Sequence, residues 1–311
     1  MIVVVAPGQG SQTPGFLDPW LAHGRSRELL EQYSDAVGID LVRHGTESDA
    51  DTIRDTAVAQ PLIVAASLLS WHALVDAGGS DHVAGVAGHS VGEISAAAIA
   101  GVLSDDEALR FVSERARAMA EAAAQNATGM SAVIGADPDE LTAKLAALDL
   151  EAANHNGGGQ VVVAGSLDAL AQLSAEPPAR ARVIPLQVAG AFHSRYMQPA
   201  RERLAEVAGT LSPADPRLPL WTNNSGERVG SGSAFVQLLV GQVASPVRWD
   251  ATMESFAADG VTGIIELAPA GALVGLAKRG LKGVPSVPVK TPDDLAAATE
   301  MLRADQPKED S

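Results

Sequence analysis

One short segment of the chain joins the pattern of a buried strand to the pattern of a helix through a glycine-containing turn. Residues 83–87 are a run of small and apolar residues suited to a buried strand, and residues 94–100 are good helix formers. Between them, residues 88–93 read Gly-His-Ser-Val-Gly-Glu. A strand that turns directly into a helix predicts an α/β layer. The central Ser90 has the setting of a nucleophile elbow, in which the hydroxyl is exposed above the sheet.

The glycines of this turn have a physical role in that interpretation. Gly88 and Gly92 leave room for the strand and the helix to pass closely, and the amide of Val91 lies at a helix N-terminus, where negative charge is stabilised. A plain βα turn fits the same residues, because glycine is frequent in this chain, at 30 of 311 residues. The motif alone therefore leaves both interpretations open.

The composition is that of a globular protein with a large core. Apolar residues make up 46% of the chain and charged residues 19%. The absence of cysteine excludes disulfides, a thiol nucleophile and cysteine-bound metal. The longest apolar stretches, such as residues 96–103, look too short to cross a bilayer, and residues 2–6 resemble a first core strand. We therefore expect a cytoplasmic protein that does not enter a membrane.

The net charge of -16 argues against binding to nucleic acid, which needs a basic surface. An acidic protein partner would need a local positive patch. Lys278, Arg279 and Lys282 lie close together late in the chain and are the best candidates for one. The same residues also fit an ordinary solvated helix end.

Strand-like and helix-like segments alternate along the chain, which predicts an α/β fold with a mostly parallel sheet. The predicted strands are residues 2–6, 83–87, 182–187, 218–222 and 263–267. The predicted helices are residues 26–36, 58–77, 91–100, 105–124, 197–210, 233–243, 249–259 and 293–304.

Smaller units follow the long helix at 105–124. They are a strand at 130–134, a helix at 137–148, a strand at 161–165, a helix at 166–174 and the strand at 182–187. This pattern predicts a small ferredoxin-like subdomain, residues 127–188, inserted in a large α/β-hydrolase-like catalytic subdomain of residues 1–126 and 189–311. We expect a cleft where the two meet.

A serine nucleophile needs a base and an oxyanion hole. His193 is the best candidate for the base, because it follows a predicted strand in a loop at the subdomain junction. His89 is expected on the wall of the cleft. Gln9 lies in a glycine turn after the first strand, and its amide could face that of Val91 to form a two-donor oxyanion hole, although a plain βα turn fits here too.

Together these segments resemble one family, the malonyl-CoA:acyl carrier protein transacylases of bacterial type II fatty acid synthesis, with the related acyltransferase domains of polyketide synthases. The resemblance covers nearly the whole chain, from residue 4 to about residue 279. The segments that carry it, in order, are residues 8–12, 56–61, 88–93, 115–119, 154 with 160–165, 190–194 and 245–249.

The resemblance implies a role for each matching catalytic residue. Ser90 would be the acylated nucleophile and His193 its base. The backbone carbonyl of Gln242 would orient the histidine, and the amides of Gln9 and Val91 would form the oxyanion hole.

It also implies a set of substrate-binding residues. Arg115 would hold the free malonyl carboxylate through two parallel hydrogen bonds, with Met119 four residues later on the same helix face. Phe192 beside the base would limit the space for a methyl branch, and Asn154 and His89 would shape the site.

The function expected from the resemblance is ping-pong transfer of malonyl from malonyl-CoA to the phosphopantetheine thiol of acyl carrier protein. It requires no metal or other cofactor, and a monomer suffices. Two alternatives stay open. One is a serine hydrolase, thioesterase or patatin-like lipase, for which Asp259-Gly260 would have to supply the second motif. The other is a non-catalytic module that binds carrier protein.

Overall fold

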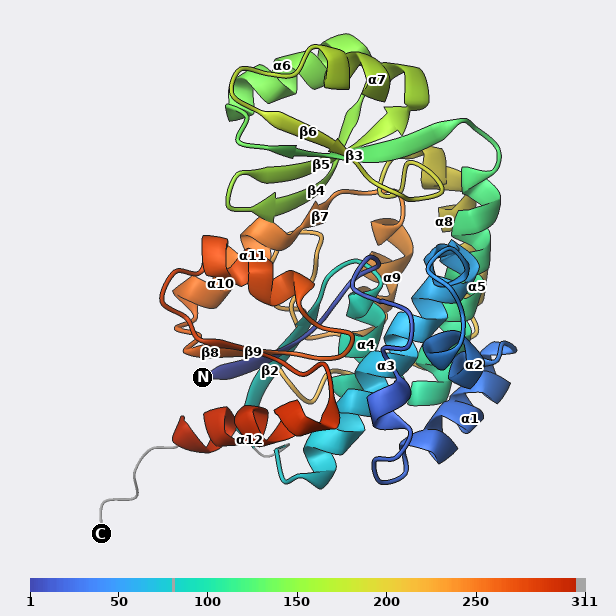
Figure 1. The fold of residues 1–311 in the computed structure, drawn as a ribbon, viewed down its shortest axis with the longest axis vertical. Helices are drawn as coiled ribbons and strands as arrows, with labels where there is room; N and C mark the ends of the chain where they lie inside the picture. Colours follow the sequence, from blue (N-terminus) through green and yellow to red (C-terminus); the bar gives the residue numbers. More distant parts are fainter. Residues whose placement is uncertain (80–81, 306–311) are drawn as a thin grey trace.

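The protein is described by a computed structural model that covers residues 1–79 and 82–305. A large part contains a parallel sheet and most of the helices, and a smaller part with its own sheet lies above it in Figure 1. The predicted α/β fold with an inserted small ferredoxin-like part is confirmed.

The parallel sheet lies in the middle of the large part. Its strands, in spatial order, are β2 (Val83–Gly88), β1 (Ile2–Ala6), β8 (Gly263–Glu266) and β9 (Ser286–Pro288). Successive side chains of β1 point to opposite faces, so Val4 joins the hydrophobic core on one side and Val3 and Val5 join the core on the other. Burial on both faces explains why β1 is an uninterrupted apolar run.

Helices cover both faces of this sheet. One core contains residues of α3, α4 and α5, and the other contains residues of α10 and α11. The helices of the large part are α1 (Ser26–Val37), α2 (Leu41–Thr46), α3 (Thr56–Asp76), α4 (Gly92–Ile99), α5 (Asp105–Ala123), α8 (Gln198–Ala208), α9 (Gly232–Gln242), α10 (Trp249–Ala258), α11 (Ala272–Gly280) and α12 (Leu295–Ala304).

The small part has the βαββαβ order of a ferredoxin-like fold. Its elements are β3 (Thr128–Ile134), α6 (Pro138–Leu148), β4 (Glu151–Gly157), β5 (Gln160–Ser166), α7 (Leu167–Ala175) and β6 (Arg182–Pro185). The sheet order is β6-β3-β5-β4, with antiparallel neighbours. A short strand of the large part, β7 (Val247–Arg248), extends this sheet by pairing parallel to β4. The two parts are therefore joined by a shared sheet edge as well as by the chain.

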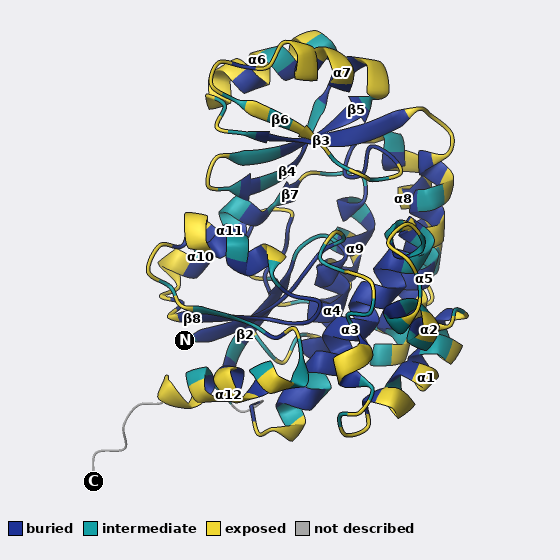
Figure 2. Cartoon of the chain, viewed as in Figure 1, coloured by how far each residue is buried: buried dark blue, intermediate teal, exposed yellow. Residues whose placement is uncertain are grey.

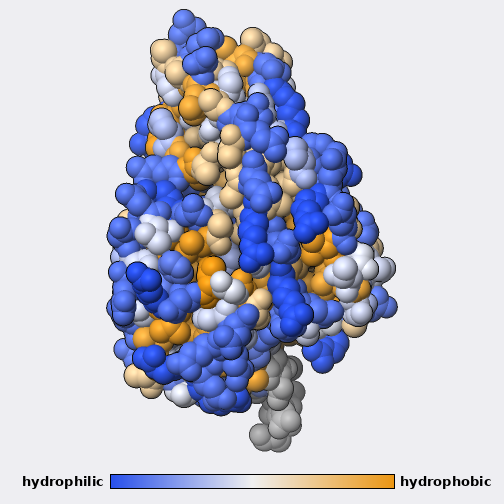
Figure 3. All heavy atoms as spheres, turned by 90° about the vertical axis from the view of Figure 1, so that its right-hand side faces the viewer, coloured by the Kyte–Doolittle hydropathy of each residue, from blue (hydrophilic) through white to orange (hydrophobic). Residues whose placement is uncertain are grey.

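Helix α3 corrects the expectation that no apolar stretch is long enough to cross a bilayer. Its 21 residues have the length and hydropathy of a membrane span, but 78% of the apolar window is buried inside the protein. Figure 2 shows α3 and the neighbouring α4 largely buried. On the face in Figure 3, hydrophilic residues predominate and hydrophobic ones show between them in separate groups. The apolar length of α3 is thus accounted for by core packing.

Other secondary-structure predictions need correction. The predicted strand at 218–222 forms only single bridges, at Leu220 and Trp221, because the prolines near it donate no ladder hydrogen bonds. The predicted strand at 182–187 ends at Pro185. Strand β4 was not expected, since its sequence is polar and lacks β-branched residues, and its pairing on both sides holds it in the sheet. Helices α2 and α11 and strands β7 and β9 were also not expected.

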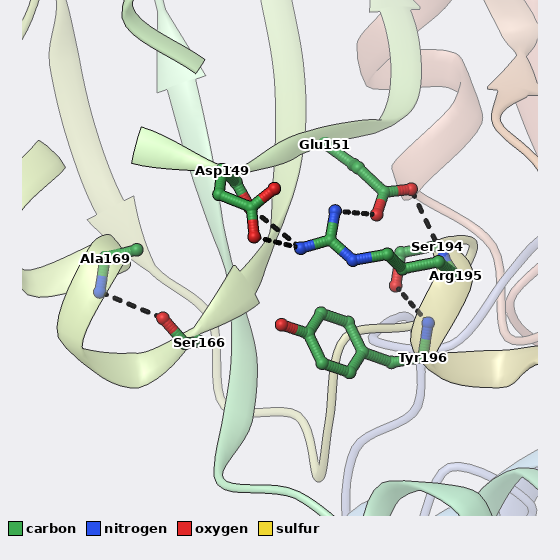
Figure 4. A network of polar contacts seen from close by, with 7 residues as sticks. All are labelled: Asp149, Glu151, Ser166, Ala169, Ser194, Arg195 and Tyr196. Carbon is green, nitrogen blue, oxygen red and sulfur yellow. Dashed lines mark hydrogen bonds and ion pairs between the residues drawn. The ribbon is translucent and has the colours of Figure 1, made fainter. Parts of the chain in front are cut away.

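A polar cluster ties the small part to the loop that follows His193 (Figure 4). The guanidinium of Arg195 donates to Glu151 Oε1 at 2.7 Å and to Asp149 Oδ2 at 2.5 Å, and it also lies over the ring of Tyr196. Glu151 begins β4 and Asp149 caps α6. Since Arg195 lies two residues after His193, this cluster links the position of that loop to the small sheet.

Candidate active site

The turn between β2 and α4 has the geometry of a nucleophile elbow. Ser90 adopts a φ of 53°, in the left-handed region that most residues avoid. A Cβ added to Gly88 would lie 2.0 Å from the backbone of Gly92, and one added to Gly92 would lie 2.2 Å from the oxygen of Ala6. Only glycine fits at these two positions, so the glycines of the motif permit the sharp turn that presents Ser90.

Asn223 holds this turn in place, although the sequence analysis did not single it out. Its Oδ1 atom accepts a hydrogen bond from the Ser90 amide at 2.7 Å, and its Nδ2 atom donates to the Gly88 oxygen at 2.7 Å. These bonds satisfy polar backbone groups that the strained turn would leave unpaired. The one signal in the sequence that could have indicated Asn223 is its position directly after the predicted strand at 218–222.

His193 lies in position to accept the proton of Ser90. The Ser90 Oγ and His193 Nε2 atoms are 2.7 Å apart, and His193 Nδ1 lies 2.8 Å from the main-chain oxygen of Gln242. A carbonyl only accepts, so Nδ1 carries the proton and Nε2 has a free lone pair. Burial, followed by the charge of Arg115, lowers the pKa of His193 to about 3. The imidazole is therefore neutral and able to act as a base.

Gln9 and Val91, whose amides are expected to form the oxyanion hole, line the same cavity as Ser90. Among residues 1–79 and 82–305, none accepts a hydrogen bond from the amide of Gln9 or Val91. The Gln9 side chain is directed elsewhere, because its Nε2 donates to the Arg54 oxygen at 3.1 Å. Val91 is the N-cap of α4, where the helix dipole favours negative charge. Both amides are free to bind an oxyanion.

Arg115 is a buried charge next to the nucleophile. Its side chain is 1% exposed, and it donates to Gln60 Oε1 at 2.5 Å and to Gln242 Oε1 at 2.8 Å. Its Nη2 atom also lies 3.4 Å from Ser90 Oγ. Burial lowers the pKa of Arg115 to about 10, so the guanidinium remains charged at neutral pH. Met119, one helical turn later, contacts Gln60 through its sulfur at 3.5 Å.

A cavity of about 450 Å³ lies in front of Ser90, between the two sheets. Of the predicted site residues, those that line it are Gln9, His89, Ser90, Val91, Met119, Asn154, Phe192, His193 and Arg279. Arg115 and Gln242 lie behind this surface and contact Ser90 from the buried side. The structure therefore brings ten of the predicted residues and Arg279 of the basic patch to one site.

His89 and Asn154 lie on the wall formed with the small sheet. Asn154 is buried in β4, and His89 Nε2 lies 2.9 Å from Asn156 Oδ1. Asn156 in turn donates to Gln160 Oε1 at 3.1 Å. Asn156 was not singled out from the sequence, because β4 was not recognised as a strand. Gln160 begins β5 and belongs to the segment 160–165 that carries the resemblance, but no role was assigned to it. Asn156 and Gln160 give this wall a row of amide groups.

The basic patch lies at the end of α11, at one side of the cavity, with Lys282 two residues beyond the helix. Lys278, Arg279 and Lys282 are exposed, and within the described chain none forms an ion pair. Arg279 packs against Gly158, where an added Cβ would lie 2.7 Å from the Arg279 Cβ. The buried Glu266 accepts hydrogen bonds from three amides at the start of α11, each at 2.9 Å, which fixes the helix there.

The structure does not support Asp259 as the catalytic partner of Ser90, which the patatin-like alternative would require. Asp259, the acid of the possible patatin-like motif, forms an ion pair with Arg228 at 2.8 Å near the end of α10. Ser90 already has His193 as its partner. In the part of the chain that the structure describes, no group of three histidine or acidic residues could hold a metal ion.

Comparison with known proteins identifies the class of enzyme. Residues 3–302 match the family model of the acyl transferase domain. The chain therefore belongs to the acyl transferase family.

Closer relatives narrow the assignment. A malonyl CoA-acyl carrier protein transacylase from Mycobacterium tuberculosis is 48% identical over 298 residues, which cover 95% of this chain and 98% of that protein. The crystal structure of MCAT from the same organism has a TM-score of 0.93 at 47% identity and covers 96% of this chain and 99% of that one. A structure of a type II PKS acyl-carrier protein in complex with its malonyl-transacylase has a TM-score of 0.90 at 30% identity, with 96% and 99% covered. Within the acyl transferases, the chain is a member of the malonyl CoA-acyl carrier protein transacylase family.

Proposed function

We propose that this protein transfers the malonyl group from malonyl-CoA to the phosphopantetheine thiol of acyl carrier protein through a malonyl-Ser90 intermediate. The observation that carries the proposal is the position of one atom. Ser90 Oγ lies 2.7 Å from the base His193 and 3.4 Å from the guanidinium of Arg115. A buried cation beside the nucleophile favours an acyl group with a carboxylate close to its reacting carbonyl.

In the first half reaction, His193 Nε2 accepts the proton as Ser90 Oγ attacks the thioester carbonyl. The negative charge that develops on the carbonyl oxygen is stabilised by the Gln9 and Val91 amides. When the tetrahedral intermediate collapses, the C–S bond breaks and His193 returns the proton to the CoA sulfur. The acyl group then remains on Ser90 as an ester. In the second half reaction the carrier thiol attacks this ester by the same steps in reverse.

Arg115 supplies the selectivity in this proposal. A guanidinium binds a carboxylate through two charge-assisted hydrogen bonds, whereas an acetyl group offers it no partner inside a desolvated site. Met119 and Phe192 line the acyl end of the cavity, and Asn154 and His89 line the wall toward the small sheet. Lys278, Arg279 and Lys282 attract the acidic carrier protein to the same opening.

The cellular setting forms part of the proposal. We place the enzyme in the cytoplasm as a monomer that supplies malonyl units for fatty acid synthesis and, with other carrier proteins, for polyketide synthesis. Serine, histidine and backbone amides are sufficient for the chemistry, so the reaction needs no metal or redox cofactor. Dialysis against a chelator should leave the transfer rate unchanged.

The experiment that tests this function follows the fate of the malonyl group. The protein is incubated with malonyl-CoA labelled in the malonyl group, with and without holo acyl carrier protein, and Ser90→Ala is the matched control. We expect label on the carrier protein at the rate at which malonyl-CoA is consumed, and none with Ser90→Ala. Release of free malonate at that rate, regardless of carrier protein, would instead identify a hydrolase. Absence of any labelled protein would identify a binding module.

A further inference from the structure

The mechanism above does not use Glu93, a buried carboxylate close to the nucleophile. Glu93, in the first turn of α4, is 1% exposed. Its Oε1 atom accepts a hydrogen bond from the Asn223 amide at 2.6 Å, and its Oε2 atom accepts one from Gln242 Nε2. Both carboxylate oxygens therefore accept hydrogen bonds from residues that also contact the main chain of Ser90.

The Gln242 side chain links Glu93 to the substrate-binding arginine. Its Nε2 donates to Glu93 and, at 3.0 Å, to the Ser90 main-chain oxygen. Its Oε1 accepts from Arg115 Nη2 at 2.8 Å. The orientation of this amide is fixed, because a guanidinium only donates and a carboxylate only accepts. Glu93, Gln242 and Arg115 therefore form one directional chain of hydrogen bonds.

Glu93 and Arg115 are buried groups of opposite charge that act on each other without a direct contact. In the described chain no carboxylate forms a direct ion pair with Arg115, whose two contacts besides Ser90 are to the amides of Gln60 and Gln242. Burial lowers the pKa of Arg115 to about 10, and the charge of Glu93 acts in the opposite direction. Burial likewise raises the pKa of Glu93 to about 7, while its hydrogen bonds and Arg115 favour the ionised form. Each group thus helps to keep the other charged.

We propose that Glu93 is a positioning residue for acyl selectivity, which acts through the Gln242 side chain to hold the Arg115 guanidinium toward Ser90. This inference rests on the proposed function, because it concerns how the enzyme prefers malonyl over acetyl groups. The role is separate from that of the Gln242 main chain, whose carbonyl orients His193.

Replacing Glu93 by glutamine changes one acceptor into a donor without changing the shape. The Asn223 amide and Gln242 Nε2 both need an acceptor, and a glutamine supplies only one. The Asn223 amide is part of the backbone and cannot turn, so the Gln242 amide must rotate. Its Nε2 would then face Arg115, and two donors would oppose each other. The disturbance is therefore transmitted to the arginine.

The test compares acylation of Ser90 by malonyl-CoA and by acetyl-CoA in the wild type, Glu93→Gln, Arg115→Ala and the double variant. The loss of a hydrogen bond to a charged group typically weakens an interaction by about one to two orders of magnitude. We therefore expect Glu93→Gln to lower the malonyl to acetyl ratio of kcat/KM by roughly 10- to 100-fold. In the Arg115→Ala background the same substitution should leave the ratio unchanged, because both changes act through one group. An unchanged ratio in Glu93→Gln, equal losses with both donors, or a further fall in the double variant would overturn the inference.

Two additional variants complete the test. Gln242→Met keeps the main-chain carbonyl for His193 but removes the side-chain link, so it should also lower the ratio; this variant decides the matter if Glu93→Gln does not fold. Asp105→Asn is the control, since Asp105 binds Tyr33 and His72 in another polar cluster and should not affect the ratio. A wild type that accepts no malonyl group would contradict the proposed function itself. A selective wild type beside an equally selective Glu93→Gln would contradict only this inference.

Discussion

The Nδ1 atom of His193 lies 2.8 Å from the main-chain oxygen of Gln242, so a peptide carbonyl orients the base and no carboxylate pairs with it in the described chain. A carbonyl fixes the tautomer but adds no full negative charge to stabilise an imidazolium. With the nearby charge of Arg115 and deep burial, the histidine stays neutral until it receives the proton of Ser90. This arrangement has a consequence for the pH dependence of stability.

The first prediction concerns His193→Asn. The folded-state pKa of about 3 lies below the ordinary value of 6.5, so below pH 6.5 the unfolded chain takes up a proton that the folded chain does not. Stability is therefore lost as the pH falls from 6.5 toward 3. Between pH 8 and pH 5 this residue should account for about 2 kcal/mol of unfolding free energy. Denaturant unfolding should be measured at pH 8 and at pH 5. Between these pH values the unfolding free energy of the wild type should fall by about 2 kcal/mol more than that of the variant.

Asparagine is the suitable replacement at this position. It tolerates the left-handed backbone of His193, at a φ of 59°, and its amide can still donate to the Gln242 oxygen. Equal losses of stability in the two proteins would contradict the pKa argument. The same variant should lose acyl transfer by ~10²- to 10⁴-fold, as expected when a general base is removed.

The second prediction concerns Phe192, which lines the cavity beside the base. Phe192→Ser opens space next to the acyl Cα atom, so the methylmalonyl to malonyl ratio of kcat/KM should rise by ~10-fold or more. Phe192→Leu, which retains most of the volume, should change the ratio much less. If the two variants raise the ratio equally, or neither raises it, Phe192 does not form the pocket wall.

The third prediction concerns the basic patch at the end of α11. The double charge reversal Lys278→Glu with Lys282→Glu should raise the KM for carrier protein by roughly 10-fold at low salt, and less at high salt, because the attraction is screened. Acylation by malonyl-CoA should be unchanged. The neutral pair Lys278→Gln with Lys282→Gln should have an intermediate effect. Similar changes in both half reactions would point to a folding defect.

The elbow could be predicted from the sequence because its signal is local. A strand, two glycines around a serine, and a helix follow each other directly, and sterics alone require glycine at Gly88 and Gly92. The loop with His193 was likewise found from its place after a strand. The ferredoxin-like character of the small part was predicted from five short alternating segments. Its sixth element, β4, was overlooked because pairing on both sides, rather than its own propensity, makes it a strand.

The polar network behind the site could not be predicted in this way. Arg115 and Gln242 are 127 residues apart and meet only because α5 and α9 pack near the same elbow. Asn223 lies 133 residues from Ser90. Glu93 was visible as part of the motif, yet its contacts depend on these distant partners. Periodicity and turn signals describe single elements and contain no information about such pairings.

The fourth prediction concerns Arg115 itself. Arg115→Ala should lose malonyl transfer steeply, by ~100-fold or more, while acetyl transfer is retained or gained, because an acetyl group no longer leaves a buried cation without a partner. Arg115→Lys should recover little, since an ammonium cannot form the two parallel hydrogen bonds of a guanidinium. The measurement is acylation of Ser90 from both donors in each variant. Equal proportional losses with both donors would show that Arg115 has only a structural role.

The central claim is that Ser90 carries the malonyl group. The most direct measurement is the mass of the intact protein after brief incubation with malonyl-CoA, followed by identification of the modified peptide. We predict that the wild type gains one malonyl group on Ser90, that acyl carrier protein removes it, and that Ser90→Ala gains none. A malonyl adduct of the same extent in Ser90→Ala, or none in the wild type, would contradict the account.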